Sequence, residues 1–160
     1  MSLDAWESFF VATVGAGAAL AGLIIVAMSV NVATIITIKS MPSRAGATIA
    51  SLLLIVIVGA AGLIPGISNM AFGGVTLAFT VIVVALHWRT SVIGFKNPHG
   101  HLRDQVLRAA FTVLQLLPML IGGVLAFDTW DALYWVAAGF LLTFAGATLN
   151  AWVLLVEILR

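Results

Sequence analysis

The sequence predicts an all-α protein that forms one integral membrane domain over residues 1–160, a bundle of five transmembrane helices. Hydrophobic residues make up 62% of the 160 residues and charged residues only 8%, whereas a soluble domain carries roughly 25% charged residues. The chain also divides into five apolar stretches, which are separated by short segments rich in proline, glycine or charge. Each stretch is about as long as the ~20 residues that a helix needs to cross the hydrocarbon core.

The first stretch, residues 9–38, contains no charged residue and is longer than a bilayer requires. Small residues recur along it at helical spacings of three, four or seven: Gly15, Ala18, Gly22, Ser29 and Ala33. Small residues let helix backbones approach closely in lipid, where van der Waals packing replaces the hydrophobic drive. We therefore expect this helix to be the one against which the others pack.

The four later spans follow from the positions of breakers and charges. Pro42 lies in the turn before the second span, and Pro65–Gly66 ends that span. A tight connection over residues 67–74 should lead into the third span, and an acidic turn at Asp128 should precede the fifth. The predicted spans after the first are residues 46–64, 75–95, 106–127 and 132–155.

The charges predict the orientation of the bundle. With five spans, all seven basic residues fall on one side: Lys39, Arg44, Arg89, Lys96, Arg103, Arg108 and Arg160. The other side carries Asp4, Glu7, Asp128 and Asp131. Because cytoplasmic loops are enriched in lysine and arginine, we predict an N-terminus outside and a C-terminus in the cytoplasm.

Polar residues inside the spans are the candidates for a functional lining. In the fifth span one face carries Gly139, Thr143, Gly146, Asn150 and Glu157, at spacings of four, three, four and seven. This line is either a packing seam, with Gly139 and Gly146 at the contact, or the polar wall of a pore or groove. The first span adds Asn31 and Thr34. The fourth adds Gln115 beside Pro118, which frees the carbonyl group of Leu114.

No cofactor, metal site or catalytic set is predicted. His87 is the only histidine inside a span, and no second span supplies a histidine as the other axial ligand of a haem. His99 and His101 lie in a loop without evident third and fourth ligands for a metal ion. No charged residue lies in the middle of a span, where it would mark an ion pathway. These absences argue against an enzyme and against an ion-coupled transporter.

The first 66 residues resemble a family of small bacterial multi-span inner-membrane proteins, some of which carry the label "modulator of FtsH protease". The similar residues are Trp6, Phe9–Ala12, Gly15, Ala18–Leu20, Gly22–Leu23, Val26–Ala27, Ser29, Asn31, Pro42, Arg44 and Pro65–Gly66. Ile25 and Ile67 depart from the pattern, which has an aromatic and a polar residue there. The resemblance implies a bacterial inner-membrane protein.

Two functions are compatible with these observations. The first is a non-enzymatic, accessory or regulatory membrane protein that associates through helix faces, with itself as a homo-oligomer or with a membrane-protein partner. The second is an oligomeric channel for ions or small solutes, lined by neutral polar residues of the first or fifth span. The lipid bilayer is a partner in both, and no basic patch interleaved with aromatic residues suggests nucleic acid.

Overall fold

The computed structural model describes residues 3–30, 32, 41–95 and 102–158, with side chains for residues 3, 5–30, 32, 42–92 and 110–152. Every regular element in this part of the chain is helical, so the predicted all-α class is confirmed. The five long helices are α1 (Glu7–Val30), α3 (Met41–Gly62), α4 (Asn69–Phe95), α5 (Leu102–Leu125) and α6 (Leu133–Ile158). Short 3-10 helices, η1 (Leu3–Trp6) and η2 (Trp130–Ala132), precede α1 and α6.

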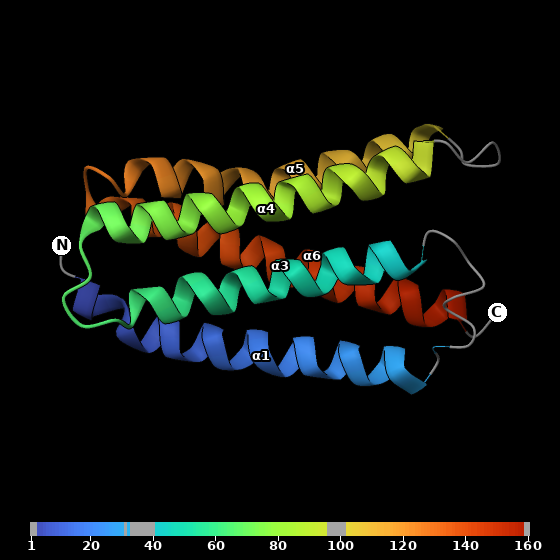
Figure 1. Cartoon of the computed structure of the whole chain (residues 1–160), viewed down its shortest axis with the longest axis horizontal. Helices are drawn as coiled ribbons and strands as arrows, with labels where there is room; N and C mark the ends of the chain where they lie inside the picture. The colour runs from blue at the N-terminus through green and yellow to red at the C-terminus, as the bar shows by residue number, and fades with distance from the viewer. Residues whose placement is uncertain (1–2, 31, 33–40, 96–101, 159–160) are drawn as a thin grey trace.

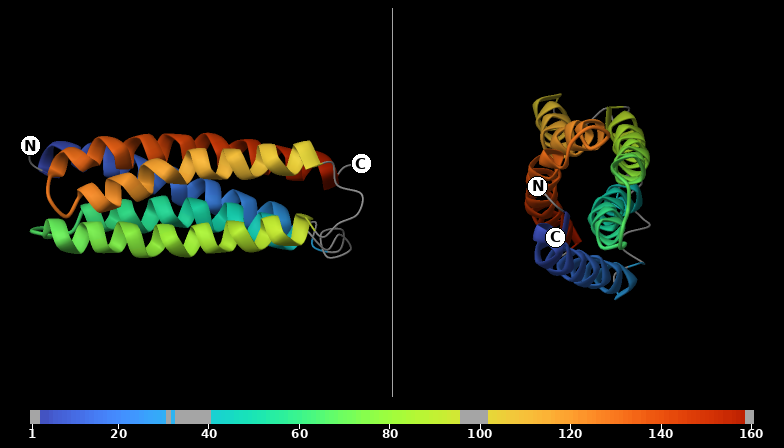
Figure 2. Two further views of the ribbon diagram at one scale, coloured as in Figure 1. Left: turned by 90° about the horizontal axis from the view of Figure 1, so that it is seen from above. Right: turned by 90° about the vertical axis from the view of Figure 1, so that its left-hand side faces the viewer.

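Successive helices run in opposite directions, and the two termini lie at opposite ends of the bundle (Figure 1). Seen end-on, α3 and α4 form one side of the bundle, α6 and α5 the other, and α1 lies at its lower edge (Figure 2). Contacts join α1 to α3, α3 to α4, α4 to α5 and α5 to α6, and α3 also contacts α6 across the bundle. This up-and-down order is expected where short connections join neighbouring antiparallel helices.

The central helix is α3, which corrects the expectation that the first helix organises the bundle. Within the 18-residue apolar stretch of each helix, 61% is buried in α3, against 22% in α1. Alanine, serine and glycine on several sides of α3 let α1, α4 and α6 all approach it, and Ala47, Ser51, Gly59 and Ala61 are buried. The apolar character of α1 instead reflects a helix whose outer face has no neighbour among the described residues.

Four helices contain stretches long and apolar enough to cross a membrane: Glu7–Val30, Pro42–Gly62, Asn69–Val92 and Trp130–Trp152. In α5 the described apolar stretch is shorter, Ala110–Leu125. The fold is therefore a helical bundle suited to a membrane, and a count of five crossings remains a prediction.

Four helices begin earlier than the sequence predicted. For α1 and α5 the first residues are Glu7 and Leu102 rather than residues 9 and 106, and α3 and α4 begin about five residues early. Pro42 lies in the first turn of α3 rather than in the preceding turn, because a proline there has no intrahelical N–H bond to lose. At the start of α4, Ser68 Oγ accepts a hydrogen bond from the N–H of Ala71 at 3.2 Å, as an N-cap does. The tight connection predicted for residues 67–74 is therefore mostly helix, and α4 begins at Asn69 rather than at residue 75.

The Pro65–Gly66 pair ends α3 as predicted, by means of a β-turn. The N–H of Ile67 donates to the carbonyl oxygen of Ile64 at 3.2 Å. Gly66, at the third position of the turn, has a φ of +72°, which fits a type II turn and favours glycine.

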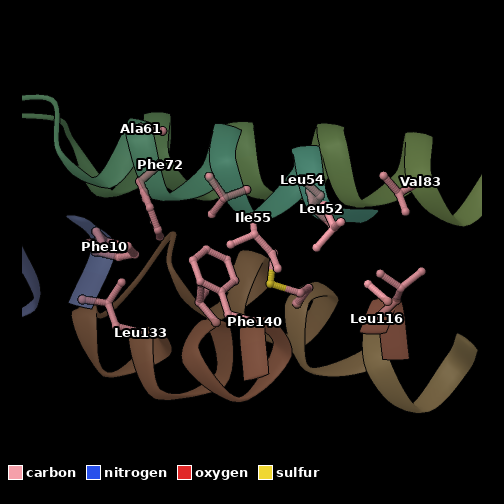
Figure 3. Packing of buried hydrophobic residues seen from close by; sticks show 14 of the residues in the cluster. Phe10, Leu52, Leu54, Ile55, Ala61, Phe72, Val83, Leu116, Leu133 and Phe140 are labelled. Carbon is pink, nitrogen blue, oxygen red and sulfur yellow. The ribbon is translucent and has the colours of Figure 1, made fainter. Parts of the chain in front are cut away.

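An aromatic cluster fills the core at the end of the bundle where α1 and α6 begin (Figure 3). Phe10 is 1% exposed, and its ring lies edge-on to Phe72 and Phe140, with centroids 6.1 Å and 6.3 Å apart. Gly59 and Gly62 of α3 leave the space that the ring of Phe10 occupies, since a Cβ at Gly62 would lie 2.8 Å from Phe10 Cε2. This cluster joins α1, α3, α4 and α6 at one end.

Charged side chains are separated between the two ends. The exposed residues Glu7, Asp128 and Asp131 lie at the end where α1 and α6 begin. Arg44, in the first turn of α3, and Arg89, near the last turns of α4, lie at the opposite end. The bundle therefore has an acidic end and a basic end.

Candidate functional site

The predicted packing line of α1 points away from the rest of the chain. Gly15, Ala18, Gly22 and Ser29 are exposed, and a Cβ at Gly15 or Gly22 would meet no atom within 4 Å. Ala33, Asn31 and Thr34 lie outside the described residues. The line of small residues therefore makes no close contact with the described part of the chain, and its contact with another molecule stays a prediction.

The face of α1 that does pack is a different line of residues. It consists of Phe10, Thr13, Gly17, Ala21 and Ile24. Gly17 lies close to α3, because a Cβ there would lie 3.1 Å from Val56 Cγ2 and 3.5 Å from the carbonyl oxygen of Leu52. Two lines of small residues run along α1, and since the helix is apolar all round, its periodicity did not distinguish them.

The predicted line on α6 lies against α5 for most of its length. A Cβ at Gly139 would lie 2.5 Å from Met119 Cγ and 3.1 Å from the backbone nitrogen of Met119. A Cβ at Gly146 would clash with Oε1 of Gln115, and Thr143, between the two glycines, is completely buried. Asn150 is half-buried, and the side chain of Glu157 lies outside the described residues.

The polar residues predicted in α5 belong to the same contact. Gln115 is buried and lies against Gly146, so that its side chain occupies the space that a larger residue on α6 would fill. Pro118, one turn further along α5, is also buried. The structure thus brings Gln115, Thr143, Gly139 and Gly146 together in one place, the α5–α6 seam.

Most buried hydroxyl groups are bonded to their own helix. Thr13, Thr48, Ser51, Thr76 and Thr80 each donate to a carbonyl oxygen three or four residues earlier, at distances from 2.6 Å to 3.1 Å. Thr143 differs, because its hydroxyl has no hydrogen-bond partner among the described residues. Hydroxyls bonded in this way need no water, which suits a closed helix contact better than a hydrated lining.

A hydrogen bond that the sequence analysis missed joins α3 to α4. Ser51 Oγ lies 2.8 Å from Nε2 of His87, and His87 is only 7% exposed. Ser51 also donates to the carbonyl oxygen of Ala47, and because a hydroxyl has one proton, the imidazole then donates from Nε2. The two residues are 36 positions apart, and only the register of α3 against α4 brings them together.

Replacing Ser51 by alanine should destabilise the bundle by about 1 kcal/mol, because His87 loses its partner in a buried place. The measurement is thermal unfolding of the purified protein in a mild detergent. Thr148→Ala, which removes an exposed hydroxyl of α6, is the control and should change the midpoint less. Equal losses in the two variants would show that the bond contributes nothing of its own.

No cluster of three potential metal ligands occurs among the residues with described side chains. His99 and His101 lie outside the described part of the chain, so that the expectation of no metal site and no cofactor remains a prediction. Comparisons of the chain with protein-family models, with curated proteins and with solved structures found no match.

Proposed function

We propose that the chain is a non-enzymatic membrane protein with an accessory or regulatory role, which works by helix-face association with a second copy or with a larger membrane complex. The contact surface is the outer face of α1, defined by Gly15, Ala18, Gly22 and Ser29. The proposed setting is the bacterial inner membrane, as the resemblance of residues 1–66 implies. The N-terminus is outside and the C-terminus cytoplasmic in this proposal.

The observation that carries the proposal is the contrast between the glycines of α1 and those of the seams. Eight glycines inside helices have a neighbouring atom in the place of the missing side chain: Gly17, Gly59, Gly62, Gly73, Gly122, Gly123, Gly139 and Gly146. Gly15 and Gly22, seven residues apart on one line of α1, have open space there. Gly46 and Gly74 are also open, but neither has a second open glycine on its helix face. Paired small residues at helical spacing are typical of helix–helix contacts in lipid.

The channel alternative has less support. Its best candidate lining in the described part of the chain, on α6, faces α5, where Gly139 and Gly146 are in close contact with Met119 and Gln115. Thr143 in the same line is 0% exposed. A flux assay in liposomes tests this alternative directly, and a flux that responds to Asn150→Leu while the unfolding midpoint does not would favour it.

The proposed contact can be tested by cross-linking, because the chain contains no cysteine. A single cysteine at Ala18 should form disulfide-linked or cross-linked adducts of defined mass in native membranes. Ala78→Cys is the matched control, since Ala78 is an exposed alanine on the outer side of α4. Equal, weak cross-linking at both positions would indicate random collision and would contradict association through α1.

Two glycine substitutions should separate contact between molecules from packing within one. Gly22→Leu should abolish cross-linking at Ala18 with little change in the unfolding midpoint of the dispersed chain, because its surroundings are open. Gly17→Leu should instead destabilise the chain by about 1–3 kcal/mol, because it forces α1 away from α3. Cross-linking at Ala18 that survives Gly22→Leu would show that Gly22 is not part of the contact, and would contradict association through this line of small residues.

The proposed orientation predicts the result of reporter fusions. A reporter fused after Arg160 should give the signal of a cytoplasmic location. A reporter inserted at Thr129, an exposed residue between α5 and η2, should give the signal of the outer side. Reporters that both read the same side would exclude five crossings.

A further inference from the structure

The unpartnered hydroxyl of Thr143 is the exception among the buried hydroxyls. Thr76 and Thr80 are as fully buried as Thr143, yet each donates to a carbonyl oxygen of its own helix at 2.8 Å and 2.6 Å. The side chain of Thr143 is 0% exposed, and its Oγ1 has no partner. A buried hydroxyl without a partner costs about 1–3 kcal/mol, so that this position calls for a group outside the described side chains.

The register of α5 against α6 shows what lies opposite Thr143. The helices are antiparallel, with Gly122 against Val136 and Met119 against Gly139. A step of three residues back along α5 thus corresponds to a step of three residues forward along α6. A further step of four residues along each helix places Gln115 level with Thr143. Gln115 indeed lies against Gly146, one turn from Thr143.

A second unsatisfied group lies in the same turn of α5. Pro118 is inside the helix and has no N–H to donate to the carbonyl oxygen of Leu114. Helix carbonyl groups point toward the C-terminus, so that this oxygen lies at the level of Gln115 and Leu116. Pro118 is buried whereas Leu114 is 55% exposed, so that the freed carbonyl oxygen lies at the border between the α5–α6 seam and the outer side of α5.

We propose that a water molecule binds in the α5–α6 seam and connects the hydroxyl of Thr143 to the carbonyl oxygen of Leu114. The hydroxyl donates to the water, the water donates to the carbonyl, and the side-chain amide of Gln115 is a third polar group within the same turn. Buried waters bind where two to four polar groups converge. Ordered waters are also one of the ways in which membrane helices satisfy the carbonyl that a proline frees. The water then holds α5 to α6 where α5 lacks a backbone hydrogen bond.

The direction in which one substitution changes the unfolding temperature distinguishes a water-bridged hydroxyl from a hydroxyl that has no partner at all. Thr143→Val keeps the shape and removes the hydroxyl, so that it should lower the unfolding temperature by about 2–4 °C if a water is bridged. An orphan hydroxyl would instead give an unchanged or higher temperature and would overturn the proposal. Thr80→Val is the control, because Thr80 is equally buried and bonds only to its own helix; its effect should be smaller.

A double-mutant cycle tests the link to Leu114. In Pro118→Ala the alanine N–H donates to the Leu114 carbonyl oxygen and satisfies it without the water. The bridge should then contribute less, and Thr143→Val should have a smaller further effect. The same loss in both backgrounds would refute the bridge. Thr143→Ser, which keeps the hydroxyl, should retain the coupling to Pro118.

A structure at a resolution that shows waters should have a density peak within hydrogen-bonding distance of Thr143 Oγ1 and the Leu114 oxygen. A direct bond between these two atoms, or no peak, would overturn the proposal.

Discussion

Gly122→Leu is expected to be among the most damaging single substitutions, lowering the free energy of unfolding by about 3 kcal/mol or more. A Cβ at Gly122 would lie 2.8 Å from Val136 Cγ2, 3.0 Å from the backbone nitrogen of Val136 and 3.2 Å from the carbonyl oxygen of Ala132. A side chain can rotate away from such a clash, but backbone atoms of α6 move only if the two helices separate. Overpacking typically costs 1–3 kcal/mol, and more where the surroundings are rigid.

Thermal or denaturant unfolding in detergent measures this loss, and two controls give it meaning. Gly22→Leu and Gly74→Leu make the same chemical change within helices where a Cβ meets nothing within 4 Å. Both should leave the midpoint close to that of the wild type or raise it slightly, because glycine is a poor helix former. If all three variants unfold alike, the close contact of α5 with α6 is not a source of stability.

Phe10→Ala should cost about 3 kcal/mol, the second large effect. The ring is 1% exposed and fills the space above Gly59 and Gly62, in contact with Phe72 and Phe140. Truncation of a buried phenylalanine leaves a cavity and usually costs 3–5 kcal/mol. The lower end of that range applies, because the reference environment in the membrane is lipid and the lost packing outweighs the lost transfer energy.

The effect should be visible locally as well as globally. Phe10 joins α1 to α4 and α6 at the acidic end, so that its truncation should expose the start of α1 to limited proteolysis before the remainder unfolds. Phe127→Ala removes the same atoms at an exposed phenylalanine after α5. Its ring lies against Gly73 on one side only, so that truncation should leave a smaller gap. A similar destabilisation by both variants would mean that the aromatic cluster is not what holds α1 in place.

The sequence predicted the class, the number of helices and the end of the second helix at Pro65–Gly66, because each rests on a local signal. Apolar length identifies a helix in lipid, and Pro65–Gly66 specifies a turn by backbone geometry. The start of α4 was missed because Gly73 and Gly74 were interpreted as turn residues. Gly73 is in fact a packing residue, and a Cβ there would lie 2.9 Å from the carbonyl oxygen of Gly123 on α5. A glycine that ends a helix and a glycine that admits a neighbour look alike in one sequence.

The same limit explains the outcome for the site residues. On α6 a polar threonine between two glycines marks one face, and that face was identified. On α1 two small-residue lines compete, and the choice between Gly17 and Gly22 depends on where α3 lies, which no local pattern contains. The Ser51–His87 bond likewise depends on the register of two helices whose facing residues are far apart in sequence.

The separation of charge between the two ends of the bundle also has an electrical consequence. With the basic end in the cytoplasm, as proposed, the membrane potential is negative inside and favours the orientation of the five charged residues whose side chains are described: Glu7, Asp128 and Asp131 outside, Arg44 and Arg89 inside. A reversed chain would carry each of them across the field, at about 2.3 kcal/mol per charge per 100 mV. For five charges this is roughly 12 kcal/mol at 100 mV. An energised membrane therefore holds the bundle in one orientation, independently of any partner that it meets there.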